Sequence, residues 1–366
     1  MSYTTGYYFE MDSQTHSLGS ALDARAREWP CRGAAWRAAN KLCDDYVEEL
    51  LAKMPANNFK AKHGLSDDLL DQLANLYRSP IVIGGHMKSG TNLTAQLLDN
   101  HPSVLVLPGD SYMFQKEQYF NAMESQAFLR YWIKRLINPT GQGPFFFLAS
   151  AGRRMESYAK IVDLFFLFIK LGKVNIEALI SAIAIIYSKK RGVLPKYWVE
   201  KTPNNHIGTN EFSCFGLPAY YIFVYRSPTT NYLSNRELAK KRGWSGAGCI
   251  ELSLNLRKTY KNILKQQLII GANAKTLNYE DLVSDTKTEM KKLASWLGVK
   301  WRKSLLIPSI DGKPAVVNSM LGDHNVAGRV INTGQRKCGI SKLEHVVISA
   351  IASGPYKSLR KYSADI

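Results

Sequence analysis

The segment from Pro80 to Leu93 constrains the fold more than any other part of the sequence, because a strand, a glycine-rich loop and a helix follow one another there. Its first residues are β-branched and apolar, as a strand covered on both faces requires, and Gly84 and Gly85 allow a sharp turn. A helix that starts after this loop points backbone N–H groups and a positive dipole at it, and Lys88 adds a full charge. The segment therefore predicts a site for phosphate or sulfate oxygens.

The position of the lysine in this loop separates two classes of phosphate-binding protein. Kinases and other nucleotide triphosphatases carry the lysine directly after the second glycine, whereas Lys88 precedes Gly90 and Thr91 follows it. The order instead resembles the phosphosulfate loop of sulfotransferases that use 3′-phosphoadenosine 5′-phosphosulfate (PAPS). A kinase of the P-loop class and a non-catalytic binder of anionic polymers are the alternative functions.

A second strand-to-helix junction lies where an apolar run ends at Arg226. Ser227 is the candidate N-cap of the helix, and Pro228 fits its first position. Asn231 and Ser234 fall on the same helical face as Ser227, so that these side chains can hold a second phosphate. Arg226 and Ser234 resemble, in their separation, the pair that binds the 3′-phosphate of PAPS in the sulfotransferases. The structural alternative is an arginine that binds carbonyl groups and a serine that faces solvent.

Two further segments resemble the same family in the expected order. Residues 198–206 resemble its E-K-[ST]-P segment, and residues 277–298 resemble its Y-E-D-L helix and the F-L-G turn that closes it. The resemblance covers residues 80–298, apart from an unmatched insert between Phe114 and Tyr197. It is closer to the glycan, tyrosyl-protein and bacterial sulfotransferases than to the cytosolic small-molecule branch.

Strand and helix patterns alternate through the matched region, which predicts parallel strands joined by crossover helices. The expected fold class is α/β: a parallel β-sheet flanked by helices, in the P-loop NTPase-like sulfotransferase fold, with N-terminal helices and a helical insert. Strands are expected at 81–85, 103–107, 197–200, 219–225 and 275–279, and helices at 91–99, 204–213, 228–241 and 280–297.

The expected organisation is a single domain with insertions. Residues 1–79 form an N-terminal helical extension packed on the core, and residues 341–366 form a C-terminal segment. Residues 80–340 form the sulfotransferase domain, and its helical insert at about 115–195 is expected to cover the acceptor site.

The insert contains the most apolar runs of the chain, at 161–171 and 176–187. Neither run approaches the ~20 residues that a membrane span needs, and charged residues interrupt them, so a buried helical hairpin is favoured over interfacial membrane contact through 145–190. Phe145, Phe146 and Phe147 precede the hairpin. In the sulfotransferases that this chain resembles, the insert after the second strand commonly covers the acceptor. The resemblance therefore implies a helical lid, and the three phenylalanines suggest that its apolar inner face receives a lipid or another apolar acceptor.

The net charge of +18 suits nucleic acid, an anionic membrane surface or an acidic substrate. The basic residues are dispersed, and no module for DNA or RNA is recognisable, so no nucleic-acid partner is expected. A cofactor with several negative charges explains part of the excess. An acceptor that is anionic or has an apolar portion is the expected partner, and the oligomeric state is left open.

The five cysteines are widely scattered and show no metal-ligand spacing, so reduced thiols, no structural zinc and no metal requirement are expected. Residues 1–16 lack the basic end and the apolar run of a secretory signal. A cytoplasmic protein is therefore expected, with membrane association as the alternative.

The resemblance implies in-line transfer of a sulfuryl group from PAPS to a hydroxyl or amine, which leaves 3′-phosphoadenosine 5′-phosphate (PAP). Lys88 would neutralise the leaving oxygen, and Lys201, which resembles a family lysine, would add a second positive charge. The N–H groups of Ser89, Gly90 and Thr91 would hold the 5′-phosphate. The cofactor-binding residues that it implies are Lys88, Ser89, Gly90, Thr91, Asn92, Arg226, Ser234, Tyr279 and Arg329.

An acceptor hydroxyl must lose a proton, so a general base is expected. Asp110 is the first candidate, because its loop resembles the place of the catalytic glutamate in glycan and tyrosyl-protein sulfotransferases; the alternative is a turn or N-cap aspartate. His206 and Glu117 are reserves, since Pro203 occupies the position of the family histidine. Glu200 is expected to be a salt-bridged carboxylate that orients Lys201, or else a catalytic group.

Two of the implied contacts have weaker sequence support. Tyr279 resembles the family tyrosine near the adenosine, with a core aromatic as the alternative. Arg329 lies in a tail that resembles the basic loop that closes over the 3′-phosphate.

Overall fold

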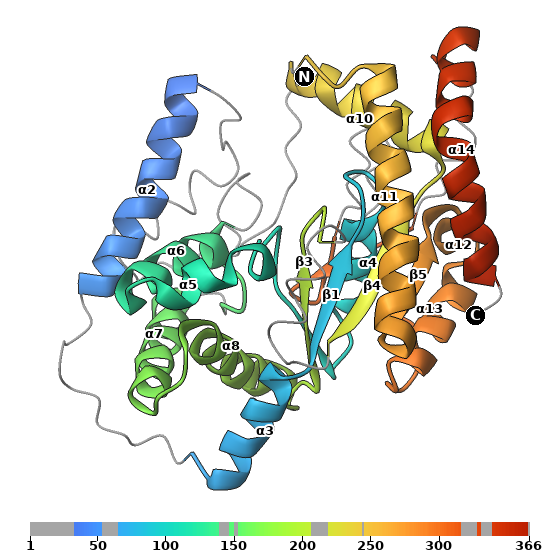
Figure 1. Ribbon diagram of the computed structural model, residues 1–366. Helices are drawn as coiled ribbons and strands as arrows, with labels where there is room; N and C mark the ends of the chain where they lie inside the picture. Colours follow the sequence, from blue (N-terminus) through green and yellow to red (C-terminus); the bar gives the residue numbers. More distant parts are fainter. Residues whose placement is uncertain are drawn as a thin grey trace. The chain divides into compact units, whose positions relative to one another are not determined.

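The computed structural model describes residues 33–52, 65–138, 146–149, 153–205, 219–243, 245–315, 328–330 and 339–364. These residues form two compact units, the sheet unit and the helical unit (Figure 1). The sheet unit contains the described residues of Arg78–Gln115 and Lys196–Ile366, and the helical unit those of Met1–Tyr77 and Lys116–Pro195. The predicted division cuts the chain into consecutive segments at residues 79 and 340, whereas each of these units combines two separate segments. The predicted division stays a prediction.

The sheet unit is built on a five-stranded sheet with the order β2-β3-β1-β4-β5. All neighbouring strands are parallel, which confirms the predicted α/β class. The strands are β1 (Pro80–Gly84), β2 (Val104–Val106), β3 (Tyr197–Lys201), β4 (Tyr220–Tyr225) and β5 (Ala274–Asn278). Because the strands are parallel, their carboxyl ends meet at one edge, where ligands bind in open α/β sheets.

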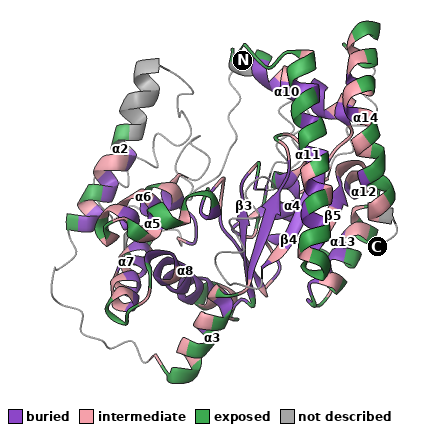
Figure 2. Ribbon diagram, viewed as in Figure 1, coloured by how far each residue is buried: buried purple, intermediate pink, exposed green. Residues whose placement is uncertain are grey.

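Helices cover both faces of this sheet. On one face, Ile81 and Ile83 of β1 pack in a cluster with residues of α4 (Thr91–Leu98) and α13 (Thr286–Trp296). On the other face, Tyr225 of β4 contacts the ring of Tyr356 in α14 (Lys342–Ala364), which also contacts Tyr260 in α11 (Cys249–Ile270). The strands are almost entirely buried between these layers (Figure 2).

The remaining elements of the sheet unit are α10 (Pro228–Arg242), η3 (Gly271–Asn273), α12 (Tyr279–Ser284), η4 (Lys303–Leu306) and the short antiparallel pair β6 (Ser309–Ile310) and β7 (Lys313–Pro314). The 3₁₀ turn η1 (Phe114–Lys116) contains the point in the sequence where the chain passes from the sheet unit to the helical unit.

Two helix predictions differ from the structure. The helix expected at 280–297 is divided into α12 and α13 at Asp285, whose carboxylate accepts the N–H of Thr288 at 3.0 Å and so starts a new helix. The helix expected at 204–213 does not start at Asn204, which has a left-handed φ of 70° and lies in a turn. The rest of that expected helix, from residue 206, is outside the described residues.

The helical unit consists of α2 (Gly33–Ala52), α3 (Asp67–Tyr77), α5 (Glu117–Ala122), α6 (Ser125–Ile137), α7 (Arg154–Lys170) and α8 (Asn175–Arg191). Its core is aromatic: Phe120, Phe128 and Trp132 contact one another, and Phe165 of α7 stacks on Phe128. The Asn175 side chain donates to the carbonyl groups of Phe120 and Met123, and so binds the start of α8 to the turn between α5 and α6.

The predicted buried hairpin of the insert is confirmed, since α7 packs against α8 and every residue of α8 from Asn175 to Tyr187 except Glu177 is buried. Phe146 and Phe147 are also buried, whereas Phe145 is outside the described residues. Among the helices that the structure describes, none is both long and apolar enough to cross a bilayer.

Candidate active site

The loop after β1 is held by its carbonyl groups. The carbonyl oxygen of Met87 accepts hydrogen bonds from Asn231 Nδ2 at 3.1 Å and Asn235 Nδ2 at 3.3 Å, and that of Gly85 accepts from the Asn204 N–H at 2.9 Å. Asn231 and Asn235 belong to α10, so the helix after β4 supports the loop after β1. Asn231 was expected to help hold a phosphate, and that role stays a prediction; sequence reasoning missed Asn235.

Two residues of this loop have unusual backbone angles. Lys88 is left-handed, with a φ of 69°, a conformation that costs about 1–2 kcal/mol for a residue with a Cβ. Gly90 has a φ of 105°, and a Cβ atom there would lie 2.4 Å from Cδ2 of Tyr279. Glycine is therefore required at position 90 by both conformation and space.

Helix α4 begins at the end of this loop. The N–H groups of its first turn, including those of Thr91 and Asn92, have no partner within the helix and point along its positive end. The Ser89 amide, expected to face a phosphate, donates to the His86 carbonyl at 3.0 Å, and the Ser89 hydroxyl accepts from Asn231. The groups of this segment that are left as candidates for binding an anion are the start of α4 and the half-buried Lys88.

The Arg226 guanidinium joins the two predicted phosphate-binding segments. Its Nη1 donates to the Lys88 carbonyl at 3.2 Å, its Nε donates to Thr230 Oγ1 at 3.1 Å, and the group lies over the Tyr279 ring at 4.2 Å. Arg226 and Tyr279, which sequence reasoning assigned to one cofactor, are therefore in contact. Ser234 lies farther along α10 and is buried.

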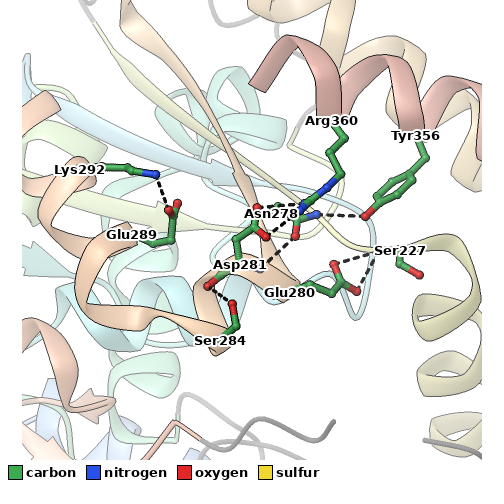
Figure 3. Close-up of polar contacts among 9 residues, drawn as sticks. All are labelled: Ser227, Asn278, Glu280, Asp281, Ser284, Glu289, Lys292, Tyr356 and Arg360. Carbon is green, nitrogen blue, oxygen red and sulfur yellow. Dashed lines mark hydrogen bonds and ion pairs between the residues drawn. The ribbon is translucent and has the colours of Figure 1, made fainter. Parts of the chain in front are cut away.

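The start of α10 is stabilised by Glu280, which sequence reasoning missed. The Ser227 N–H donates to both oxygens of Glu280, at 3.1 and 3.2 Å (Figure 3). Thr230 Oγ1 also donates to Oε1 of Glu280, at 2.8 Å. Ser227 occupies the predicted N-cap position, but its side chain makes no capping bond. The sequence shows an acidic residue directly after Tyr279, but it does not show that this residue caps α10. That contact depends on the pairing of β4 with β5, which brings the segments after the two strands together.

The same corner anchors the last helix of the chain. Arg360 of α14 makes two hydrogen bonds to Asp281, at 2.8 and 3.0 Å, and Asn278 Nδ2 donates to Tyr356 Oη at 3.4 Å (Figure 3). Asn278 Oδ1 also accepts the Asp281 N–H at 3.1 Å and caps α12. The segment 277–283 therefore binds both α10 and α14.

Glu200, at the end of β3, is fully buried and receives three side-chain donors. Ser111 and Thr202 hydroxyls each donate to Oε1 at 2.5 Å, and Asn205 Nδ2 donates to Oε2. Burial raises the pKa of Glu200, while these three donors and nearby Lys201 oppose the shift. The expected salt bridge is replaced by hydrogen bonds to hydroxyl and amide groups.

The partners of Glu200 extend its network to the loops on either side of β3. Thr202 Oγ1 accepts the Tyr112 N–H at 2.9 Å, and Asn205 Nδ2 also donates to the Ile83 carbonyl of β1 at 3.2 Å. Tyr112 has a left-handed φ of 56°. One buried carboxylate thus binds the loops that follow β2 and β3 and the strand β1 together.

Asp110 and Lys201, two predicted catalytic residues, form an ion pair. The Lys201 side chain is only 6% exposed, whereas Asp110 is 38% exposed. The pair therefore presents an accessible carboxylate backed by a nearly buried cation. In this position Asp110 is accessible to an incoming ligand, while Lys201 is held by its ion pair with Asp110.

His86 is a titratable group of the loop that sequence reasoning passed over. Its Nδ1 donates to the Met87 carbonyl at 2.9 Å, since a carbonyl oxygen can only accept. Burial lowers the pKa of His86, opposed by the hydrogen bonds with Met87 and Asn231. The neutral ring is therefore favoured near pH 7, with Nε2 as its unprotonated nitrogen.

Three other predicted residues stay predictions. His206 is outside the described residues. Glu117 belongs to the helical unit, where burial raises its pKa to about 7 although it accepts a hydrogen bond from Asn121. Arg329 is exposed within the short described stretch 328–330. Within the described ranges, no group of three or more His, Cys, Asp or Glu residues could hold a metal ion.

Several solved sulfotransferases are similar to this chain at low identity. The sulfotransferase domain of the Synechococcus PCC 7002 olefin synthase has 16% identity and a TM-score of 0.44, over 75% of this chain and 94% of that one. A sulfotransferase from Alicyclobacillus acidocaldarius has 13% identity and a TM-score of 0.42, over 78% and 95%. Mouse sulfotransferase SULT7A1 complexed with PAP has 13% identity and a TM-score of 0.33, over 66% of each chain.

Comparison of the sequence alone gives the family. No curated protein matches the chain. Residues 80–303, more than half of the chain, match the family model described as "Sulfotransferase family", over the same region that carries the β1 loop, Lys201, Arg226 and Glu280. The chain belongs to the sulfotransferase family.

Proposed function

We propose that this sulfotransferase takes the sulfuryl group from PAPS and transfers it to a hydroxyl or amine of an acceptor, with PAP as the second product. The hydrogen bond from Arg226 to the Lys88 carbonyl carries this proposal, because it joins two anion-binding segments that are 138 residues apart in sequence. PAPS carries anionic groups at both the 5′ and the 3′ positions of its ribose. Two adjacent cationic sites match that chemistry better than the single phosphate cradle of a kinase.

The residues present fit this cofactor. Lys88 and the N–H groups of Gly90, Thr91 and Asn92 would hold the 5′-phosphosulfate at the start of α4, where the space beside Tyr279 excludes any side chain at position 90. Arg226 and Ser234 would hold the 3′-phosphate, with Arg329 as a further cation. Tyr279, which lies under the Arg226 guanidinium, would face the adenosine.

PAPS would supply an activated sulfuryl group whose departure leaves negative charge on a phosphate oxygen. Lys88 and Lys201 supply positive charge for that oxygen without having to move in from solvent, which is the main way in which such sites lower a barrier. Asp110 takes the acceptor proton on its exposed carboxylate. Glu200 and its three partners keep the loops that carry Asp110 and Lys201 in place.

Isothermal titration calorimetry with PAP and with magnesium-ATP tests the donor. We expect PAP to bind without metal and tighter than ATP, and Arg226→Ala to weaken PAP binding by at least about tenfold, since a hydrogen bond to a charged group contributes about 1.5–3 kcal/mol. Arg257→Ala removes an exposed arginine of α11 and is the matched control. Preference for magnesium-ATP, or equal losses in the two variants, would contradict the proposal.

Turnover of an acceptor library with labelled donor tests the base. Asp110→Asn should lower kcat by about 10²–10⁴-fold, with PAP affinity retained, because the amide cannot accept the proton. Asp110→Glu restores a carboxylate and should recover part of the rate. Unchanged turnover in Asp110→Asn would move the base to another residue.

A further inference from the structure

Helix α11 exposes four large aliphatic side chains. Ile250 and Leu254 near its start are 60% and 50% exposed, and Leu268 and Ile269 near its end are 68% and 60% exposed. The helix shows exposed residues along its length (Figure 2). Isolated apolar residues on a surface are ordinary, but a group aligned on one helix is typical of a contact surface.

The middle of the same helix face is basic. Arg257, Lys258, Lys261 and Lys265 are all exposed, and intervals of three and four residues place them in line with the aliphatic side chains. Glu251 is the one acidic residue of the helix. The exposed face of α11 therefore combines a concentrated positive charge with aliphatic groups at both ends.

Helix α14 extends this surface. Cys249 Sγ donates to the Glu344 carbonyl at 3.7 Å, so the first turns of α11 and α14 lie side by side (Figure 1). Leu343 and Val346 in that turn of α14 are 74% and 62% exposed. We call the exposed residues of α11, with Leu343 and Val346, the α11–α14 face.

The other side of α11 fixes its orientation. Leu252, Leu256 and Ile263 are buried, and Tyr260 contacts Tyr356 of α14 and donates to the Arg226 carbonyl. The helix cannot turn to bury its aliphatic residues without leaving the sheet. Its 22 residues span about 33 Å, enough to contact several lipid headgroups.

We propose that the α11–α14 face docks the protein on an anionic lipid bilayer. The cations meet the headgroups, and the aliphatic side chains enter the boundary with the acyl chains, as in interfacial amphipathic helices. Nucleic acid would use the cations but leave the leucine and isoleucine residues without a role. A second copy of the chain would place like charges opposite each other, which is unfavourable.

Co-sedimentation with vesicles tests the proposal on the full chain. We expect binding to phosphatidylcholine vesicles that contain phosphatidylserine and little binding to phosphatidylcholine alone. Each cation near such a surface contributes about fivefold to partitioning, so Lys258→Gln with Lys261→Gln should weaken it about twenty-five-fold. The matched control is Lys287→Gln with Lys303→Gln, which removes the same charge from exposed positions on α13 and η4.

A second variant separates lipid from other partners. Leu268→Ser with Ile269→Ser should also weaken vesicle binding, by at least about tenfold, because two aliphatic side chains no longer leave water. Equal binding to the two vesicle types, or equal losses in the two lysine variants, would overturn the proposal. So would duplex DNA binding that the serine variant leaves unchanged, or a dimer in light scattering that the same variant dissociates.

Discussion

Glu200 and Glu280 both hold loops at the carboxyl end of the sheet, but they do so in different surroundings. Glu200 is fully buried and accepts from three side chains, those of Ser111, Thr202 and Asn205. Glu280 is half-buried and accepts from the Ser227 N–H and the Thr230 hydroxyl. Glu200 is the last residue but one of β3, and Glu280 lies in the first turn of α12, directly after β5.

The difference lies in what can replace each carboxylate. Water can reach the partners of Glu280, so their hydrogen bonds can be exchanged at a modest cost. The donors around Glu200 are closed off from solvent, so the hydrogen bond that each would lose could not be replaced by one to water. The loops on the Glu200 side therefore depend on one side chain, whereas those on the Glu280 side depend on several.

The largest expected effect is that of Glu200→Ala. Three buried donors lose their acceptor, and each costs about 1–3 kcal/mol, so the free energy of unfolding should fall by about 3 kcal/mol or more. Urea denaturation followed by fluorescence measures it. Glu200→Gln keeps one acceptor oxygen and should cost less. If Glu200→Ala lost less stability than Glu280→Ala, the buried carboxylate would not be the harder of the two to replace.

The same carboxyl group predicts a pH dependence. Burial raises the pKa of Glu200 in the folded protein, so the folded state binds a proton more tightly than the unfolded state does. The contribution of Glu200 to stability is therefore fully present below its unfolded pKa of about 4.3 and is lost as the pH rises through the raised pKa. The free energy of unfolding of the wild type minus that of Glu200→Gln should therefore fall as the pH rises from about 4.3 through the raised pKa. A difference that rises with pH would show that the donors outweigh burial.

Gly90→Ala tests the contact between the loop after β1 and the Glu280 corner. The new Cβ would approach Tyr279 Cδ2 at 2.4 Å at a left-handed φ, so we expect a loss of about 2 kcal/mol. Gly172→Ala is the control: its φ is also left-handed, at 80°, but nothing lies within 4 Å. If the two variants lose equal stability, the contact with Tyr279 contributes nothing. Tyr279→Ala should relieve part of the loss.

Glu280→Ala should have a smaller effect, about 1 kcal/mol, which is typical of a lost helix cap. Thermal unfolding measures this loss, and an intact α10 should be visible in its circular dichroism. A loss of 3 kcal/mol or more would mean that the half-buried site is as closed to water as the Glu200 site.

The smallest effect is expected for Asp281→Asn. Asp281 and Arg360 are both 44% exposed, and such surface pairs contribute about 0.5 kcal/mol. High salt should reduce even this difference, as measured by urea denaturation at two ionic strengths. A larger, salt-independent loss would show that the anchoring of α14 depends on this pair.

The sequence predicted the sheet well, mainly because β1, β2 and β4 are apolar runs that end at breaks such as Gly84 and Arg226. Every strand end falls within two residues of its predicted position. The break between α12 and α13 was missed, because it depends on the local capping bond of Asp285, which the longer apolar periodicity concealed.

The site was predicted in part for a similar reason. Lys88 and Arg226 were identified at their strand-to-helix junctions, whereas Asp110 and Lys201 were identified only through the family resemblance. The structure brings Asp110 and Lys201 together. The neutral partners of Glu200 could not be found in this way. Their contacts require β3 to lie between β2 and β1, a strand order that no single segment encodes.

Lys88, Tyr112 and Asn204 share one property: each is a left-handed residue with a side chain, in the loop after β1, β2 or β3 respectively. Such residues are energetically unfavourable, and glycine would relieve each one. A design guided by thermal stability alone would therefore replace them. Because they lie in loops at the carboxyl ends of the strands, where ligands bind in open α/β sheets, a stabilised variant intended to keep its activity should retain these three residues.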